Sequence, residues 1–282
     1  MAKRALRFGI KVAQMDGSYA QMRDAWLEAD RLGFDTGWGH DHLLNQNDVT
    51  LPEDEGWTVL TALLVESKRI RGGLMVTANT FRHPGVLAKM VTTLDIVSGG
   101  RVDLGLGAGW FAQEHEQYGL ALPPIGERLQ RLDEACQVVK ALWTEARATF
   151  DGKHYQLRAA IHEPKPVQKP HPPLVIGTKG ERVGLRIAAR HANVWNMANG
   201  TAEEFRTKSS LLDQYCKEIG RDPDEIERSI QFLPEAMKGD AVARAREFMA
   251  AGATHLIFSA PVPYTAAGVR WLWNEVVTPL RK

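Results

Sequence analysis

The 282-residue sequence lacks the features that would tie it to a membrane, to nucleic acid or to a disulfide framework. No apolar run approaches the roughly 20 residues that span a bilayer. The formal charge of +1 gives no overall attraction to nucleic acid or anionic lipid. The two cysteines, Cys136 and Cys216, lie in helical patterns without a metal-spaced partner, as is typical of thiols in a reducing compartment. Residues 1–8 have no apolar segment behind their basic side chains, so we expect no signal peptide. These absences predict a cytoplasmic protein that binds neither nucleic acid nor membranes.

The chain instead shows a regular alternation of short apolar runs and amphipathic windows. Apolar residues make up 44% and charged residues 24%, which suits a soluble protein with a sizeable core. Strands are expected at 7–14, 36–42, 72–79, 102–107, 174–177, 193–197, 229–233 and 255–259. Helices are expected at 18–33, 57–69, 84–99, 127–143, 181–190, from 201, at 240–251 and at 264–277. Eight such units predict a single (β/α)8 TIM barrel domain over 1–282, with an insertion at about 111–172 after the fourth strand. A doubly wound sheet is the alternative, but it seldom has eight units.

Local signals mark several boundaries. Ser18 with Gln21 matches a capping box, and Thr201 with Glu204 does the same. Pro84 suits the first turn of a helix that Gly99 then ends. Within the insertion, residues 150–157 are expected to be extended, and the proline-rich stretch 164–173 is expected to lead as an irregular arm into the next strand.

The second expected strand ends in His40, Asp41 and His42. In a barrel of this kind the carboxyl ends of the strands face the reaction site, so the triplet is a metal site, a cofactor platform or a structural cluster. A metal site needs further ligands at later strand ends, and only Lys179 offers one, so we expect none. Buried histidine and aspartate side chains can also satisfy each other by hydrogen bonding.

Two glycine-containing segments follow later strands. Residues 105–109 read GLGAG, which lacks the G-x-G-x-x-G spacing of a dinucleotide site. Small residues there would leave space for a flat ligand, or would pack against a neighbouring strand. Residues 177–181 read GTKGE, where Thr178 and Glu181 match a capping box and Lys179 adds a positive charge. A phosphate site at a helix start is the functional interpretation, and an ordinary helix cap is the alternative.

Aromatic side chains also gather near the expected strand ends. They are Trp38, Trp57, Trp110, Phe111 and Trp195. A single aromatic residue there usually belongs to the core, but several on one face predict walls for a planar ring system.

Taken together, five segments resemble one known family. They are 29–42 (ADRLGFDTGWGHDH), 77–84 (TANTFRHP), 98–110 (SGGRVDLGLGAGW), 126–129 (GERL) and 172–177 (PPLVIG). In this order they resemble the luciferase-like monooxygenase superfamily, and within it the coenzyme F420-dependent oxidoreductases common in actinobacteria.

The resemblance implies a flavin or deazaflavin lying across the carboxyl face of the barrel. The family's Asp-His pair matches Asp41 and His42. A bulge after strand three, where relatives often carry a non-proline cis peptide, matches 76–78. The residues expected to contact the cofactor are Gln14, His40, His42, Val76, Thr77, Ala78, Asn79, Gly107, Ala108, Gly109, Gly177, Thr178, Lys179 and Gly180.

One position departs from the family pattern. The sugar-phosphate dehydrogenases of the family carry an acidic Glu after the strand-four glycine, whereas this sequence has Trp110. A sugar phosphate is therefore not the expected substrate, and a more apolar one is. Acid chemistry from this loop would come from Glu114 or His115. His42 is expected beside the reacting centre, with Asp41 fixing its tautomer, so His42, Asp41 and Glu114 are the catalytic candidates.

The resemblance thus predicts an F420-dependent oxidoreductase. It would transfer a hydride between C5 of the deazaflavin and an electron-poor alkene, imine or carbonyl. An FMN-dependent monooxygenase on the same barrel is the alternative, and a non-catalytic F420 carrier is a third possibility. Relatives form dimers through their second and third helices, so a homodimer through 58–65 and 86–97 is expected, although both segments could simply pack on the barrel.

Overall fold

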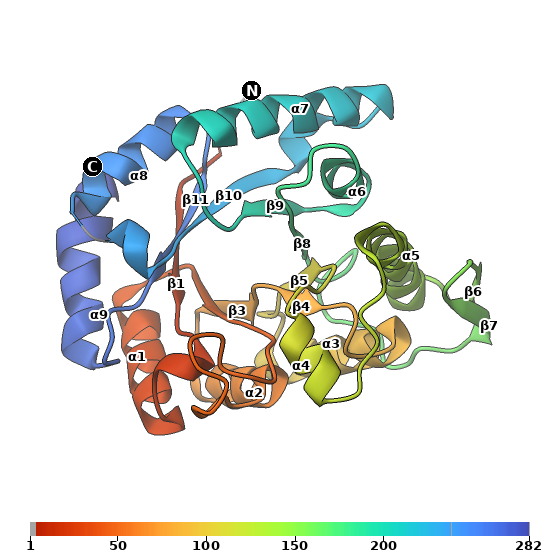
Figure 1. Cartoon of the computed structure of the whole chain (residues 1–282), viewed down its shortest axis with the longest axis horizontal. Helices are drawn as coiled ribbons and strands as arrows, with labels where there is room; N and C mark the ends of the chain where they lie inside the picture. Colours follow the sequence, from red (N-terminus) through yellow and green to blue (C-terminus); the bar gives the residue numbers. More distant parts are fainter. Residues whose placement is uncertain (1–3, 238, 282) are drawn as a thin grey trace.

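The computed structural model describes residues 4–237 and 239–281 and shows a ring of parallel strands enclosed by helices (Figure 1). The strands are β1 (Arg7–Lys11), β2 (Thr36–Gly39), β3 (Arg71–Leu74), β4 (Thr77–Ala78), β5 (Leu104–Gly107), β8 (Leu174–Gly177), β9 (Val194–Met197), β10 (Glu227–Phe232) and β11 (His255–Ser259). Their order is β3-β2-β1-β11-β10-β9-β8-β5-β4. Since β3 and β4 share the third position and Gly72 forms a parallel bridge to Val102, the ring is nearly closed. The predicted (β/α)8 barrel is confirmed.

The helices cover the outside of the ring. They are α1 (Tyr19–Leu32), α2 (Gly56–Glu66), α3 (Pro84–Ser98), α5 (Ile125–Thr144), α6 (Gly184–His191), α7 (Ala202–Glu218), α8 (Ala241–Ala250), α9 (Ala266–Leu272) and α10 (Thr278–Arg281). The Ser18–Gln21 capping box and the stop at Gly99, with φ of 67°, are confirmed. Thr201 accepts from the Glu204 amide, so half of the second box is present. In the described part of the chain no helix is long and apolar enough to cross a membrane.

The barrel has an outer and an inner core. Phe8 and Ile10 of β1 pack with the large cluster between strands and helices. A separate inner cluster is formed by Trp38, Met75, Val175, Val194 and Ile257. The two clusters exist because successive side chains of a strand point to opposite faces of the sheet.

The expected insertion is present after β5. It contains α4 (Ala112–Gln117), α5 and an antiparallel hairpin of β6 (Ala148–Asp151) and β7 (Gln156–Ala160), which projects beyond α5 (Figure 1). Exposed apolar side chains lie on α2 (Val65) and α3 (Val86, Ile96 and Val97). The homodimer through these helices stays a prediction.

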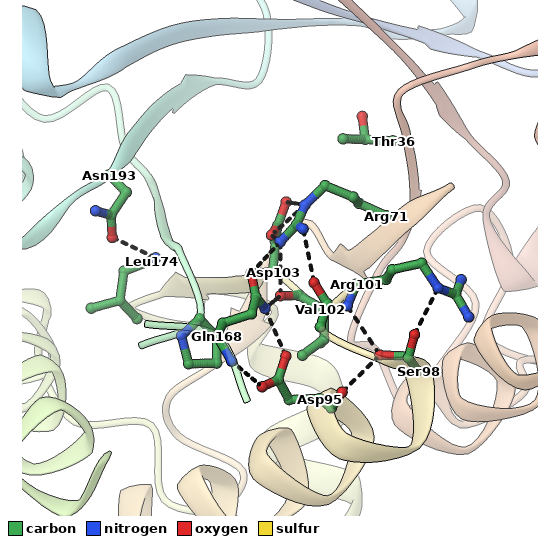
Figure 2. A network of polar contacts seen from close by, with 12 residues as sticks. Thr36, Arg71, Asp95, Ser98, Arg101, Val102, Asp103, Gln168, Leu174 and Asn193 are labelled. Atoms are coloured by element: carbon green, nitrogen blue, oxygen red, sulfur yellow. Dashed lines mark hydrogen bonds and ion pairs between the residues drawn. The ribbon is translucent and has the colours of Figure 1, made fainter. Parts of the chain in front are cut away.

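A polar network closes the amino end of the barrel (Figure 2). Arg71, at the start of β3, contacts the Asp103 carboxylate and donates to Gln168 Oε1 at 2.7 Å. Gln168 Nε2 in turn donates to Asp95 Oδ1 at 2.7 Å and to the Val102 carbonyl at 2.8 Å. Hydrogen bonds therefore hold the proline-rich arm that contains Gln168 across the amino end of the barrel. The candidate functional side chains lie at the opposite, carboxyl end.

Three expected strands are shorter than the sequence pattern indicates. β1 stops at Lys11 and β2 at Gly39, so Gln14 and residues 40–42 lie in loops at the carboxyl face. The run 72–79 is broken by a cis peptide bond between Met75 and Val76. The last expected helix is likewise divided, with a π-helical turn at Trp273–Val277 between α9 and α10.

Candidate active site

His42 lies in the loop after β2, at the carboxyl face of the barrel, and is held by a carboxylate from the insertion. Its Nδ1 lies 3.0 Å from Glu114 Oε1 and 3.1 Å from Oε2. Glu114, on α4, is 1% exposed and also accepts a hydrogen bond from the Leu43 amide at 3.0 Å. His42 Nε2 has no partner among the described residues and remains available to a ligand. The imidazole is thus fixed in orientation with one free nitrogen.

Asp41 does not hold His42, so the expected tautomer-fixing contact is wrong. The Asp41 carboxylate accepts from Arg82 at 2.6 and 3.1 Å and from the Ala78 amide at 3.0 Å. A two-pronged guanidinium–carboxylate contact of this kind fixes geometry as well as charge. Asp41 therefore binds the loop after β2 to β4. The contact between Arg82 and Asp41 could not be predicted from the sequence, because no local pattern pairs residues that are 41 positions apart.

His40 forms a second histidine–glutamate pair. Its Nε2 lies 2.7 Å from Glu53 Oε1, and its ring meets the His42 ring edge-on with centroids 5.1 Å apart. Burial holds the pKa of His40 well below its usual value. Burial, together with the nearby carboxylates of Asp16, Asp54 and Glu114, raises the pKa of Glu53 to about 8. Both shifts favour uncharged partners, so the pair is a neutral hydrogen bond near pH 7.

Glu53 was not among the residues expected from the sequence. It lies in a run of acids (Glu53, Asp54, Glu55) before α2, which is a common pattern at the start of a helix. Glu55 fills that capping role by accepting from two α2 amides. The pattern cannot show that Glu53 instead turns inward.

Gln14 was expected to contact the cofactor ring, but its amide is committed to the protein backbone. Gln14 Nε2 donates to the His40 carbonyl at 2.7 Å, and Gln14 Oε1 accepts from the His40 amide at 3.1 Å. A Cβ at Gly56 would lie 2.3 Å from the same carbonyl. The absence of a side chain at Gly56 therefore lets α2 pack closely against the hydrogen-bonded Gln14 and His40. Gln14 therefore positions His40, and the expected ring contact is replaced by this structural contact.

The cis bond expected near 76–78 lies between Met75 and Val76, and the bulge places Val76 over several strand-end glycines. A Cβ at Gly107 would lie 2.5 Å from Val76 Cγ2, and one at Gly177 would lie 2.8 Å from Val76 Cγ1. A Cβ at Gly105 would meet the Leu74 carbonyl at 2.0 Å. The expectation that these glycines directly leave room for a flat ligand is wrong, because the neighbouring strand and its bulge fill that space.

Two buried polar atoms next to the bulge have no hydrogen-bond partner among the described residues. They are Thr77 Oγ1 and Asn79 Oδ1, on side chains that are 0% and 4% exposed. Leaving such an atom unsatisfied costs about 1–3 kcal/mol. A bound heteroaromatic ring with N–H and C=O groups would satisfy them, so this part of the site fits a flavin or deazaflavin. Asn79 Nδ2 reaches the Tyr155 hydroxyl at 3.2 Å, beside a cavity of about 270 Å³.

The expected phosphate site after β8 differs from the sequence pattern. α6 begins at Gly184, its N-cap Val183 makes no side-chain cap, and Glu181 instead pairs with Lys208 at 2.7 Å. The predicted Thr178–Glu181 capping box is therefore wrong. The Gly180 amide, an expected phosphate donor, already donates to Thr178 Oγ1 at 3.1 Å, whereas the Thr178 hydroxyl keeps its own proton to donate.

Lys179, the expected cation of that site, is engaged as well. Its ammonium lies 3.2 Å from Glu204 Oε1 and 3.1 Å from Asn199 Oδ1. A phosphate could bind Lys179 only in competition with the Glu204 carboxylate.

The loop after β5 contributes Ala108 and Gly109. Gly109 has φ of 77°, and its carbonyl accepts from Arg128, so its conformation requires glycine independently of any ligand. Ala108 is half-buried and packs against the outer core.

Only part of the expected aromatic wall lies at the site. Trp38, Trp57 and Trp195 are buried core residues, so the prediction is wrong for them. Trp110 and Phe111 stack with centroids 5.3 Å apart, and both present their rings edge-on to His42. Trp110 is 62% exposed and can contact a ligand.

His115 belongs to the scaffold. Its Nε2 lies 2.7 Å from Thr80 Oγ1, and its Nδ1 lies 2.7 Å from the Phe111 carbonyl. Both nitrogens are therefore used, and of the two candidates on α4 only Glu114 reaches His42.

Comparisons with known proteins agree with this architecture. The family described as luciferase-like monooxygenase matches residues 6–271. An F420-dependent glucose-6-phosphate dehydrogenase of Microbacterium testaceum is 34% identical over 79% of this chain. The chain spans just under two thirds of that relative's length (66%).

Two solved structures share the fold over nearly the whole chain. One is the coenzyme F420-dependent tetrahydromethanopterin reductase of Methanopyrus kandleri, with a TM-score of 0.82 at 20% identity, covering 99% of this chain and 100% of that one. The other is an F420-dependent secondary alcohol dehydrogenase in complex with an F420–acetone adduct, with a TM-score of 0.86 at 18% identity and the same coverage. With a family model matched almost end to end, a barrel of the same architecture and a carboxyl face suited to a ring cofactor, the chain belongs to the luciferase-like monooxygenase family.

Proposed function

We propose that the protein is an F420-dependent oxidoreductase that transfers a hydride between C5 of the deazaflavin and an electron-poor C=C, C=N or C=O carbon. The observation that supports this best is the pair of unsatisfied atoms on Thr77 and Asn79, facing the same end of the barrel as the free Nε2 of His42. The F420-dependent relative that is 34% identical to this chain supports the choice of cofactor. When bound, F420 supplies the hydride chemistry, and the protein supplies binding, orientation and proton transfer.

The residues around the bulge would hold the ring. Val76 gives an apolar surface, and Thr77 and Asn79 give a hydroxyl and an amide carbonyl for the polar edge of the ring. Lys179 would hold the tail phosphate after releasing Glu204. The Thr77 and Asn79 contacts would satisfy atoms that the free protein leaves unpaired, whereas the Lys179 contact would replace its pairing with Glu204.

His42 would provide or accept a proton at Nε2. The Glu114 carboxylate accepts from Nδ1–H and fixes the orientation of the ring, so that a proton on Nε2 would be directed at an oxygen or nitrogen of the substrate as negative charge develops there. Trp110 and Phe111 would exclude water from this nitrogen and present an apolar surface to the substrate. We accordingly propose an apolar substrate rather than a sugar phosphate.

The cofactor assignment is tested by titrating the purified protein separately with F420 and with FMN and following absorbance and fluorescence. Reduced F420 is then supplied with conjugated alkenes, imines, carbonyls and glucose 6-phosphate. Binding of F420 and its substrate-dependent oxidation are expected. Binding of FMN with oxygen consumption would replace the proposal with the monooxygenase alternative, and tight F420 binding without turnover of any compound would indicate a carrier.

A variant checks that the ring lies where proposed. Thr77→Val keeps the shape of the side chain and removes a hydroxyl that has no partner, so folding stability should not fall. The Kd for F420 should rise about tenfold, which corresponds to one hydrogen bond of roughly 1.4 kcal/mol. Thr93→Val, on the exposed face of α3, is the matched control and should leave the Kd for F420 unchanged. An unchanged Kd in Thr77→Val would place the ring elsewhere.

A further inference from the structure

Lys11, the last residue of β1, points into the barrel. Phe8 and Ile10 belong to the outer core, and neighbouring side chains of a strand alternate, so Gly9 and Lys11 face inward. A Cβ at Gly9 would meet Thr36 Oγ1 at 2.5 Å and Ile257 Cγ1 at 2.9 Å. Lys11 is one layer further toward the carboxyl end, where the candidate active site lies. Lys11 was not among the site residues expected from the sequence.

A line of polar side chains from β10 and β9 holds the Lys11 ammonium across the barrel. Lys11 Nζ donates to Gln231 Oε1 at 3.2 Å. Gln231 Nε2 donates to Asn196 Oδ1 at 2.8 Å, and Asn196 Nδ2 donates to Ser229 Oγ at 2.9 Å. Since both amides already donate along this line, the Gln231 carbonyl is directed at Lys11. The ammonium is therefore held in one place without a charged partner.

Two of the three N–H donors of Lys11 have no acceptor among the residues that the structure describes, and no carboxylate there forms an ion pair with it. Lys11 nevertheless keeps part of its surface exposed although the barrel surrounds it. Burial lowers the pKa of Lys11 to about 8, and the more distant Asp16 carboxylate opposes that shift. The Lys11 charge also lowers the pKa of His40, which places it beside the site.

A purely structural role for Lys11 is poorly supported. A buried ammonium with one neutral hydrogen bond costs free energy that an uncharged side chain of similar length would not. Two free donors on a partly exposed side chain close to His40 instead suit a ligand that completes the coordination of the ammonium.

We propose that Lys11, positioned by Gln231 and Asn196, binds an anionic oxygen of the ligand in the barrel mouth. Carboxylate-bearing substrates and a negatively charged ring oxygen of the cofactor share this chemistry. The assignment to a substrate or to F420 rests on the proposed function, whereas the recognition of an anionic oxygen does not.

The test measures the Lys11 side chain directly. Protein labelled with 13C,15N-lysine is titrated with pH, and the Nζ signals report the pKa of each lysine. Lys11→Met identifies the Lys11 signal, and Lys140→Met is the matched control, because Lys140 is a half-buried lysine with a lowered pKa on the outer helix α5. The titration is repeated with cinnamate, with the uncharged cinnamamide, and with F420. Gln231→Glu gives a second identification if Lys11→Met does not fold.

We expect cinnamate or F420 to raise the pKa of Lys11 from about 8 by about one unit, since a nearby negative charge favours the ammonium. Cinnamamide should have no effect, and Lys140 should not respond. Gln231→Glu should raise the pKa of Lys11 without any ligand and abolish the response to cinnamate. A Lys11 signal that responds to neither cinnamate nor F420 overturns the proposal.

The source of the oxygen follows from F420 binding in the absence of substrate. If Lys11→Met raises the Kd for F420 about tenfold, the oxygen belongs to the cofactor. If the Kd is unchanged while the cinnamate response is present in the parent protein, it belongs to the substrate. A parent protein that does not bind F420 but shows the cinnamate response would refute the proposed function and leave the anion site standing. Turnover with F420, together with no change in the pKa of Lys11, would support the proposed function and overturn the anion site.

Discussion

Glu114 holds His42 through Nδ1 at 3.0 Å, although 72 residues separate them in the sequence. The contact joins the loop after β2 to α4 of the insertion. It fixes the direction of the free Nε2, the atom at which we propose that a proton is transferred.

The first prediction concerns this contact. Glu114→Gln keeps an oxygen for the Leu43 amide but removes the negative charge beside His42. We expect kcat to fall about 10- to 100-fold, at or below the lower end of the roughly 10²–10⁴-fold that general acid–base catalysis contributes, because His42 itself remains, with the Kd for F420 unchanged. Because the proposed proton donor loses its negative neighbour, the limb of the pH–rate profile on which activity falls as pH rises should shift to lower pH. Glu116→Gln on the exposed face of α4 is the control, and an unaltered pH–rate profile in Glu114→Gln would mean that Glu114 only supports the loop.

The second prediction concerns the packing of the bulge. Gly107→Ala places a Cβ 2.5 Å from Val76 Cγ2 and should lower the free energy of unfolding by about 1–3 kcal/mol, as overpacking does. It should also weaken F420 binding, because Val76 must move. Adding Val76→Ala should restore part of the stability. Gly126→Ala, where nothing lies within 4 Å, is the control. Denaturant unfolding measures both, and equal stability of Gly107→Ala and the parent would contradict the packing described.

The third prediction is a pH dependence. The pKa of Glu53 is about 8 in the folded protein against an ordinary 4.5, so between these values the folded state holds a proton that the unfolded state has lost. Its contribution to stability therefore decreases as pH rises through this window. Glu53→Gln should make the unfolding free energy less dependent on pH between pH 5 and 8, and Glu145→Gln, at an exposed glutamate after α5, should not. Equal slopes for the parent and Glu53→Gln would show that Glu53 is ionised in the folded state.

The fourth prediction tests the tail phosphate site. Lys179 is paired with Glu204 at 3.2 Å, so Glu204→Gln should free the ammonium and lower the Kd for F420. Lys179→Met should raise the Kd about tenfold, as the loss of one charge-assisted contact does. Glu203→Gln on the exposed side of α7 is the control, and fluorescence titration measures all three. A Kd that is the same in Glu204→Gln and Lys179→Met would move the phosphate to another part of the rim.

The barrel could be predicted from the sequence because its signals are local. The alternation of strands and helices, the Ser18–Gln21 box and the stop at Gly99 each depend on a few adjacent residues. Strand ends were less predictable, because the chain continues apolar past Lys11 and leaves the sheet only where its hydrogen-bond partners end.

The pairing of side chains in the site could not be predicted from the sequence. Adjacent position suggested that Asp41 serves His42, yet Asp41 binds Arg82 and Glu114 takes its place. Which carboxylate reaches which histidine depends on how the loops cross the barrel mouth. The glycines at the ends of β5 and β8 were equally hard to interpret from the sequence. They must be small because the Val76 side chain, from the segment after β3, packs against them.

The short helix α4 bears Glu114, and the stacked Trp110 and Phe111 lie immediately before it. The aromatic surface that we propose meets the substrate and the carboxylate that holds His42 are consequently parts of one short segment. A redesign of this segment for a bulkier compound would displace the proton-handling group along with the aromatic rings. Selectivity and turnover should therefore change together when the segment is altered.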